Sequence, residues 1–233
     1  MHIPDGYLGP ATCGATFVAM IPVWVLAVRA AKKRLHSRTV PMLAMLSAVA
    51  FLVMMFNWPV PDGTTAHMVG GTLIAILLGP WAAILGITVV LVIQAFFFGD
   101  GGILALGANC FTMAFALPMT GYLIYKLMMK LTTKKTAVIH GIAAGISAYI
   151  AINVAAVVAA FLFGIQPYIN EGFCPFGLEL AIPAMLLAHL VTAGPVAGVV
   201  TGVVIGYMAK TRAYLLGADY KAITAETSEK PAE

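Results

Sequence analysis

The sequence predicts an all-α integral membrane protein, and two observations lead to this class. Of its 233 residues, 61% are hydrophobic and only 9% are charged, whereas soluble domains carry about 25% charged residues. The apolar stretches are also continuous and close to the ~20 residues that cross a bilayer as a helix, instead of the ~10-residue alternation of a membrane barrel. Such a chain cannot cover a water-facing surface, so we interpret it as one helical membrane domain.

Continuous apolar stretches predict seven transmembrane helices. The stretch 67–98 needs division, because a single helix of that length would reach roughly 48 Å, more than a bilayer core. Gly79-Pro80 lies in its middle, and Gly followed by Pro ends helices. The predicted helices are Ala11–Ala31, Pro41–Trp58, His67–Gly79, Trp81–Phe98, Ile103–Met129, Thr136–Phe163 and Leu178–Ala209.

The distribution of charge predicts the orientation. With seven spans and the N-terminus outside, all 13 Lys and Arg fall on the inner side, as expected for cytoplasmic loops. A six-span arrangement would put Lys126–Lys135 outside, so we reject it. The net charge of +4 therefore indicates orientation and not nucleic-acid binding. We predict a membrane domain over 1–213, including a metal-chelating N-terminal segment over 1–10, and a cytoplasmic C-terminal tail over 214–233.

The third predicted helix is short, and this has a consequence for the residue that begins it. About 13 residues reach roughly 20 Å, less than the ~30 Å core of a bilayer. We therefore expect His67 to lie below the outer surface, at the bottom of a recess. Irregular backbone at that depth is tolerated only where protein buries it or where it lines a cavity.

The chain begins with a chelating sequence, Met1-His2-Ile3-Pro4-Asp5-Gly6. The α-amine, the main-chain nitrogen of His2 and one of its ring nitrogens can bind a metal ion as fused rings. A fourth nitrogen would complete a square-planar site, the geometry of Ni(II) or Cu(II), whereas Zn(II) prefers a tetrahedron. This chelate requires a retained Met1 with a free amine, and a residue as large as His2 should hinder removal of Met1.

His67 is the predicted fourth ligand. Of the other histidines, His36 lies in the basic inner loop, His140 begins a helix on the inner side, and His189 lies about a dozen residues into the last helix. Taken alone, a histidine at position two usually has no such role, and a single histidine at the start of a helix is more often a cap or a hydrogen-bond donor. Two histidines on one face that lacks cations together favour a metal site, because ionisable groups at membrane depth are candidates for function.

Several polar residues are predicted to surround this site. Ligating histidines usually donate their other N–H to a neighbouring group. We expect Asp62, Thr64 and Thr65 to cap the third helix, whose N-terminus would favour neutral imidazole, and Asp5 and Asp62 to offset the charge of the ion. For the two in helices, an ordinary interhelical hydrogen bond is the alternative. The candidates are Asp5, Asp62, Thr64, Thr65, Gln94 and Asn109.

These segments resemble the nickel/cobalt substrate-binding components of energy-coupling-factor transporters. The resemblance extends over about residues 1–210 and depends on separated motifs in order. They are Met1 to Gly6, Asp62-Gly63-Thr64-Thr65-Ala66-His67, Leu78-Gly79-Pro80, Gln94-Ala95, and Gly99-Asp100-Gly101-Gly102 through Leu106-Gly107-Ala108-Asn109.

The resemblance implies a seven-helix bundle in a prokaryotic cytoplasmic membrane, in which one N-terminal helix is added to a six-helix core. It implies metal ligands at Met1, His2 and His67. The form Pro4-Asp5 is more similar to nickel members than to cobalt members, so Ni²⁺ is the expected substrate and Co²⁺ the alternative. The implied partners are a transmembrane coupling protein, cytoplasmic ABC-type ATPases and a small accessory membrane subunit. The chain itself has no GxxxxGK[ST] loop for nucleotide.

Two other classes of function are weighed against metal capture for ATP-driven uptake. An autonomous carrier or channel needs charged residues or broken helices along a path through the membrane, and the interiors of 103–129 and 136–163 carry no charge there. An intramembrane metalloenzyme needs a general base beside an open metal position. The sequence has no HExxH motif, and a planar four-nitrogen site leaves little room for a substrate water.

Small residues at helical spacing predict close helix contacts. Ala27xxxAla31 and Ala44xxxAla48 are candidates for docking the coupling protein, with packing inside the bundle as the alternative. A stripe of glycines on the last helix is interpreted as packing within the bundle. It consists of Gly194, Gly198, Gly202 and Gly206, and Gly141xxxGly145 lies on the preceding helix.

Overall fold

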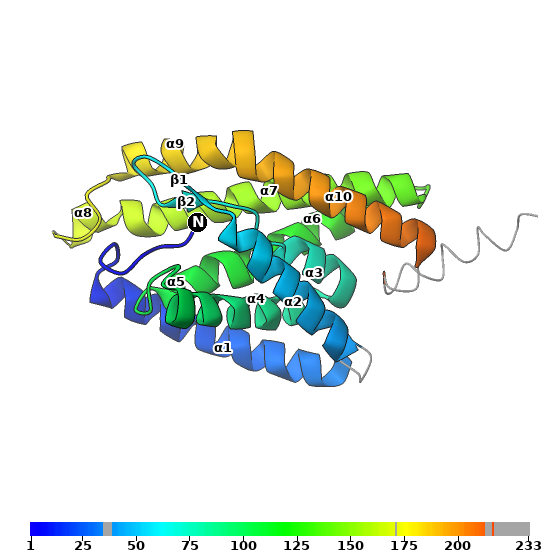
Figure 1. Ribbon diagram of the computed structural model, residues 1–233, viewed down its shortest axis with the longest axis horizontal. Helices are drawn as coiled ribbons and strands as arrows, with labels where there is room; N and C mark the ends of the chain where they lie inside the picture. The colour runs from blue at the N-terminus through cyan, green and yellow to red at the C-terminus, as the bar shows by residue number, and fades with distance from the viewer. Residues whose placement is uncertain (35–38, 171, 213–215, 217–233) are drawn as a thin grey trace, which may run out of the picture.

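The computed structural model describes residues 1–34, 39–170, 172–212 and 216. Long helices run along one axis, with the first at one side of the bundle and the last at the other (Figure 1). The N-terminus lies between these two sides, next to a short hairpin (Figure 1). The first residues are therefore part of the interior of the fold.

The first two helices agree with the prediction to within about three residues. They are α1 (Pro10–Arg34) and α2 (Thr39–Met55). The indole Nε1 of Trp24 donates a hydrogen bond of 3.0 Å to Thr88 Oγ1 on α4 (Pro80–Ile93). This bond joins α1 to the centre of the bundle, where α1 packs on α4.

A two-stranded hairpin follows α2, which the sequence analysis did not predict. Its strands β1 (Trp58–Pro59) and β2 (Thr65–Ala66) pair antiparallel. The turn is closed by a 3.0 Å hydrogen bond from Val60 N to Thr64 O, and Asp62 adopts a left-handed conformation with φ 57°. The hairpin returns the chain into the bundle, so the residues after β2 become buried.

The predicted break at Gly79-Pro80 is confirmed. The helix α3 (Gly71–Leu78) ends at Gly79, which has φ 90° and whose N–H donates to Ala75 O at 2.9 Å. Pro80 is the first residue of α4. Its missing N–H costs nothing there, because the first turn of a helix has no carbonyl to receive it.

The predicted start of the third helix at His67 is wrong. α3 begins only at Gly71 and has 8 residues, about 12 Å of helix. The residue before it, Gly70, has φ 79°, a left-handed conformation that glycine adopts at little cost and that breaks the helix. Residues 67–69 are non-helical and buried. The protein thus buries this irregular backbone, and its depth in the membrane stays a prediction.

Three of the predicted helices contain π-helical turns, which the sequence analysis did not predict. Such turns are rare and are frequent at functional sites. Each π-helical turn directly continues an α-helix, so that consecutive segments form one long helix. The segments are α4 with η1 (Gln94–Phe98); α5 (Leu106–Asn109), η2 (Cys110–Ala116) and α6 (Leu117–Leu131); and α9 (Leu178–Ala188), η3 (His189–Ala193) and α10 (Gly194–Thr211).

The glycine stripe packs within the bundle, as predicted. α7 (Ala137–Gly164) begins at its N-cap Thr136, is followed by the short α8 (Gln166–Ile169), and lies along α10. A Cβ atom added at Gly202 would lie 2.9 Å from Gly141 O, and one added at Gly145 would lie 2.9 Å from Gly198 O. The two backbones are therefore in direct contact, which only residues without a side chain permit.

We expect Gly202→Ala to destabilise the protein. The new methyl group would meet the main-chain oxygen of Gly141, and overpacking of this kind costs about 1–3 kcal/mol. Thermal unfolding in detergent should show the midpoint lowered by roughly 3 °C or more. The control is Gly14→Ala on α1, where a Cβ atom meets nothing within 4 Å. Equal midpoints for the two variants would contradict the assigned packing.

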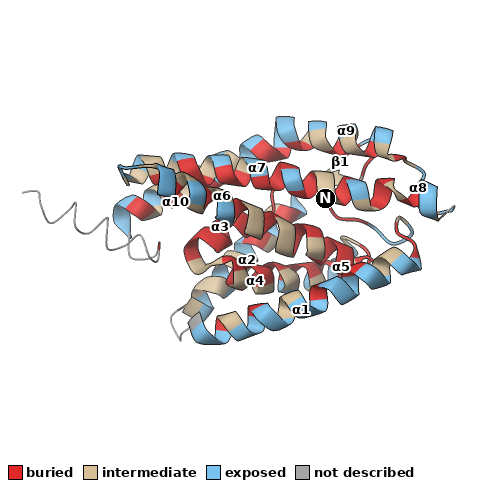
Figure 2. Ribbon diagram, turned by 180° about the vertical axis from the view of Figure 1, so that it is seen from behind, coloured by how far each residue is buried: buried red, intermediate tan, exposed pale blue. Residues whose placement is uncertain are grey.

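The outer faces of the bundle are apolar. Large hydrophobic side chains are exposed along the outside, among them Phe97 at 79% and Leu131 at 75%, and buried residues concentrate between the helices (Figure 2). Four helical segments in the described residues are long and apolar enough to cross a membrane: Pro10–Lys33, Pro80–Phe98, Ala137–Ile169 and Leu178–Thr211. The fold is that of a multi-pass membrane protein; the count of seven crossings and the orientation of the termini stay predictions.

The two alanine pairs differ in their surroundings. Ala27 and Ala31 are 0% and 7% exposed, so the prediction that they dock a partner is wrong for this pair, and they serve packing inside the bundle. Ala44 and Ala48 on α2 are exposed. Apart from Leu216, the predicted tail over 214–233 lies outside the described residues.

Candidate metal centre

The N-terminal segment is held in place by its main chain. Ile3 N donates to Asn109 Oδ1 at 2.8 Å, and Asn109 Nδ2 donates back to Ile3 O at 3.0 Å. Gly102 N also donates to Ile3 O at 2.9 Å. Asn109 is the last residue of α5 and ties the N-terminal segment to this helix. It makes no hydrogen bond to the ring of His2 or of His67.

Asp5 has a structural role that differs from its predicted one. Its carboxylate accepts the N–H groups of Ile103, Leu104 and Ala105 at 3.0, 2.9 and 3.3 Å. These are the free donors of the turn that leads into α5, and a carboxylate satisfies such donors well. Asp5 is exposed and anchors the N-terminal segment. The prediction that it accepts from a ligating histidine is wrong.

The amine of Met1 is buried against the hairpin. It donates to Thr65 O and, at 2.8 Å, to Thr65 Oγ1, and Met1 is 0% exposed. Burial lowers the pKa of the amine well below its usual value, and the charge of Asp100 opposes this only in part. With its pKa lowered, the amine loses its proton more readily than an exposed amine does, which frees the lone pair that can bind a metal ion. Thr65 contacts the amine, whereas the sequence analysis expected it beside a histidine or as a cap of the third helix.

The ring of His2 is buried in a defined tautomer. Its Nε2 lies 3.1 Å from Gln94 Oε1, and because an amide oxygen only accepts, Nε2 carries the proton and Nδ1 keeps a lone pair. Burial, followed by the nearby amino terminus, lowers the pKa of His2 to about 3, and Gln94 opposes this. Nδ1 is the nitrogen that can close a chelate ring with the main-chain nitrogen. Gln94 contacts the ligand candidate, as expected.

The ring of His67 has the complementary arrangement. Its Nδ1 lies 3.1 Å from Met68 O, so Nδ1 carries the proton and Nε2 has a lone pair. Nε2 has no hydrogen-bond partner, and the residue is 0% exposed. Its pKa is lowered first by burial and then by the amino terminus and His2. The neutral imidazole thus results from burial, and the predicted contribution of a helix N-terminus is wrong.

The two rings lie against each other. Their centroids are 4.6 Å apart with 24° between the ring planes. The fold therefore brings Met1, His2 and His67 together from segments far apart in the sequence. Among the described residues, no three His, Cys, Asp or Glu side chains gather closely enough to hold a metal ion. The amine of Met1 and the main-chain nitrogen of His2 are further donors available to an ion at this place.

Two further predicted neighbours do not contact these ligand candidates. Asp62 is exposed at the turn of the hairpin, and the N–H and hydroxyl of Thr64 donate to Met185 S at 3.5 and 3.7 Å. Neither they nor Thr65 cap α3, whose N-cap is Gly70 without a side-chain hydrogen bond. The physical reason is that the chain continues for four residues beyond the hairpin before α3 begins.

Asp100 belongs to the site, although it was not among the predicted site residues. Its Oδ1 lies 3.2 Å from His2 Nδ1, without the geometry of a hydrogen bond. Asn57 Nδ2 donates to its Oδ2 at 3.2 Å. Burial raises the pKa of Asp100, while the amino terminus and Asn57 oppose the shift. The available signal was a carboxylate in the glycine-rich outer turn 99–102.

His189 is a second residue that the sequence analysis set aside. It is 0% exposed, its Nδ1 lies 2.7 Å from Met185 O, and its Nε2 has no hydrogen-bond partner. It begins η3, which packs against β2. The sequence analysis set His189 aside because it lies about a dozen residues into the last helix. The hairpin, however, places the site at the level of His189 along that helix.

An open recess leads from the surface to the site. It has a volume of about 430 Å³, and its lining includes Asp62, Asp100, His2 and Thr65. Met1 and His67 are not part of the lining and are completely buried. The recess thus contacts His2, whereas we expected His67 at its bottom.

Comparison with known proteins places this arrangement in a family. Residues 2–215 match the family described as "Cobalt uptake substrate-specific transmembrane region". A putative metal transport protein of Methanocaldococcus jannaschii is 55% identical over 213 residues, which make up 91% of this chain and 93% of that protein. A probable fused nickel transport protein of Lactiplantibacillus plantarum is 50% identical, over 83% of this chain and 60% of that protein. A crystal structure titled as a transition metal transporter superposes with a TM-score of 0.87 at 46% identity and covers 95% of this chain and 99% of that one.

The chain belongs to the family of cobalt-uptake substrate-specific transmembrane proteins. The fused relative extends well beyond the matched region, since the match covers 60% of its length.

Proposed function

We propose that this protein captures Ni²⁺, with Co²⁺ as the alternative substrate, at the outer face of a prokaryotic cytoplasmic membrane for uptake into the cell. The ligands are the amine of Met1, the main-chain nitrogen and Nδ1 of His2, and Nε2 of His67. One observation carries this proposal. Two stacked, buried imidazoles each have the ring nitrogen needed for the chelate free of a hydrogen-bond partner, beside a buried amine.

The chemistry of four nitrogens favours nickel. Nitrogen ligands in a plane suit Ni(II) and Cu(II), whereas Zn(II) takes tetrahedral sites. The main-chain nitrogen of His2 must lose its proton to bind, so the chelate carries one negative charge and lowers the charge of the bound ion to +1. The fused relative is named as a probable nickel transport protein, which agrees with nickel as the substrate. The family description refers to cobalt, which is the alternative substrate.

Transport across the membrane requires partners. The chain shows no nucleotide-binding loop, so we propose a transmembrane coupling protein and cytoplasmic ABC-type ATPases, with the N-terminus outside and seven crossings. The extra length of the fused relative supports a further small membrane subunit. The protein is then a transport subunit and not an enzyme.

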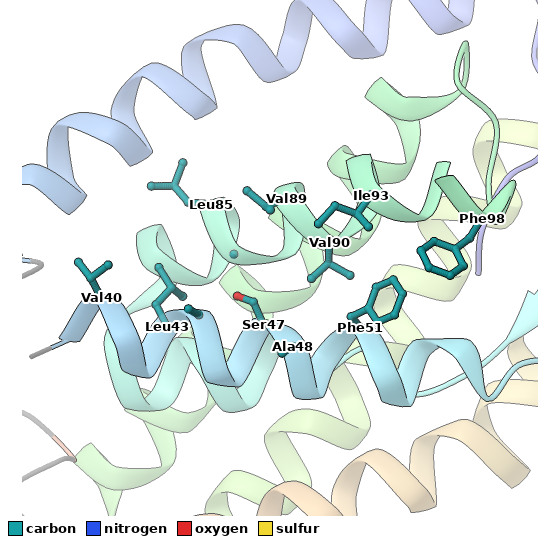
Figure 3. Close-up of a pocket in the computed structure, with 12 residues that line it drawn as sticks. Val40, Leu43, Ser47, Ala48, Phe51, Leu85, Val89, Val90, Ile93 and Phe98 are labelled. Carbon is teal, nitrogen blue, oxygen red and sulfur yellow. The ribbon is translucent and has the colours of Figure 1, made fainter. Parts of the chain in front are cut away.

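A groove between α2 and α4 suits the coupling protein. It has a volume of about 600 Å³ and is lined almost entirely by apolar side chains, with Ser47 as the single hydroxyl (Figure 3). Ala44 and Ala48 form part of its α2 side, and Gly86 part of its α4 side. Small residues permit close approach of a partner helix in lipid. The groove offers no metal ligand, so docking and metal binding use different surfaces.

The test of this function is titration of the purified protein in detergent with Ni²⁺ and Co²⁺, followed by optical spectroscopy. We expect a yellow nickel complex with about one ion per chain, as for planar nitrogen coordination, and weaker binding of cobalt. A pale-green octahedral nickel spectrum would contradict the planar site. Tighter cobalt binding would make Co²⁺ the substrate.

The pH dependence of binding should report the burial of the ligands. Burial lowers the pKa of His2 to about 3 and also lowers the pKa values of the Met1 amine and of His67. Fewer protons must therefore be displaced when the ion binds than in an exposed Met-His peptide, in which the amine, the imidazole and the main-chain N–H all lose protons. The logarithm of the affinity should accordingly rise less steeply between roughly pH 6 and 8 for the protein than for the peptide, and equal slopes would contradict the buried site.

A further inference from the structure

Two atoms at the inner end of the recess face each other in an unusual way. His2 Nδ1 and Asp100 Oδ1 are 3.2 Å apart. Gln94 holds the proton of the ring on Nε2, so both facing atoms are acceptors and no proton lies between them. Two lone pairs in contact repel each other, and a buried polar atom without a partner is costly. A cation between them would remove both penalties.

The spacing also fits a metal ion. Two ligand atoms at roughly 2.1 Å from one ion and at right angles are about 3.0 Å apart. The observed distance of 3.2 Å is only slightly longer than this, and a small rotation of either side chain would remove the difference. Asn57 holds the other carboxylate oxygen at 3.2 Å, so Oδ1 stays directed at the ring.

The position of this pair determines the order of contact. His2 and Asp100 line the recess, whereas Met1 and His67 are not part of its lining. Asp100 is 16% exposed, and Met1 and His67 are buried completely. Asp62 is at the rim of the same recess, and no Lys or Arg among the described residues lines it. An ion that enters from outside therefore meets Asp100 and His2 before the other ligands.

We propose that Asp100 is the entry ligand for the metal ion, an inference that rests on the proposed function. The hydrated ion exchanges two water molecules for Asp100 Oδ1 and His2 Nδ1. The amine of Met1, the main-chain nitrogen of His2 and Nε2 of His67 then replace the carboxylate and the remaining waters. One proton leaves the main-chain nitrogen to water, and no electron is transferred. The carboxylate thus lowers the barrier for entry and, by reversibility, for exit.

The experiment is stopped-flow binding of Ni²⁺ to the full chain in detergent, monitored at the absorption band of the planar complex. Asp100→Asn keeps the size of the side chain and its contact with Asn57. We expect the association rate constant to fall on the order of 10-fold or more. The dissociation rate should also fall, so that Kd changes much less than either rate. Asp100→Glu should recover part of the loss.

Asp62→Asn is the matched control, because it removes the same charge from the rim of the same recess, and asparagine tolerates the left-handed conformation of that position. We expect a change of about twofold, which should vanish in 1 M salt, where the Debye length is roughly 3 Å. The Asp100→Asn effect should persist there.

Three results would overturn the role of Asp100. Equal, salt-sensitive losses in the two variants would show that the recess acts only by long-range attraction. An unchanged association rate with faster dissociation would make Asp100 a counter-charge of the bound ion. Unchanged rates would exclude any role. The proposed function fails separately, if the unmodified protein forms no nickel complex.

Discussion

Replacement of His67 is expected to abolish high-affinity nickel binding. His67 Nε2 is the fourth nitrogen of the proposed plane, and the rings of His67 and His2 stack with their centroids 4.6 Å apart. Loss of a supporting outer group weakens metal sites about 10–100-fold, and loss of a direct ligand should exceed this, with an effect on the order of a thousand-fold, or about 4 kcal/mol.

Two variants separate the ligand from its packing. His67→Ala opens a cavity at a completely buried position, whereas His67→Gln keeps most of the volume and removes the imidazole. Isothermal titration with Ni²⁺ should show no high-affinity phase for either. His36→Ala, which removes a histidine from the predicted inner loop, should bind normally. A tight one-to-one complex in His67→Gln would exclude His67 as a ligand.

Extension of the chain by one residue before Met1 should have an effect of similar size, although every side chain is retained. The extension converts the amine into an amide and moves the new amine away from His2. Met1 is 0% exposed, and its amine donates to the main chain and hydroxyl of Thr65, so the added residue has no space in the site. Nickel affinity should fall on the order of a thousand-fold, and the yellow complex should be absent.

A smaller modification tests whether misfolding causes this loss. Selective acetylation of the amine removes its lone pair and adds only a few atoms. Its product should bind as weakly as the extended protein, and its thermal unfolding midpoint should stay within a few degrees of the unmodified protein. One residue added at the C-terminus is the control. Normal nickel binding by the extended chain would exclude the amino-terminal chelate and leave the two histidines to be explained otherwise.

Much of the helical fold could be predicted from the sequence. Long apolar stretches indicated the class of fold, and Gly79-Pro80 indicated where a long stretch divides, because both residues end helices locally. The glycine stripe on α10 indicated a close contact with α7, which the structure confirms. These features depend on composition and on residues a few positions apart.

The parts that were predicted wrongly include one with local signals and one that depends on contacts across the sequence. The start of α3 was placed at His67, although Asp62-Gly63 is a turn signal and Gly70-Gly71 is a signal for a break. Ala27 and Ala31 have the same spacing as Ala44 and Ala48, and only the packing of α1 decides that the first pair is buried.

The sequence alone determined which chemistry the N-terminus can offer, since the amine, the main-chain nitrogen and the ring of His2 are neighbours in the chain. It also indicated His67 as the partner through charge and topology. Tertiary structure decided the surroundings: Asn109 holds Ile3 from 106 positions away, and Asp100 reaches His2 from a separate turn. It also decided the acidity of the ligands, because burial by distant helices, and not any local motif, lowers the pKa values of the amine and of both imidazoles.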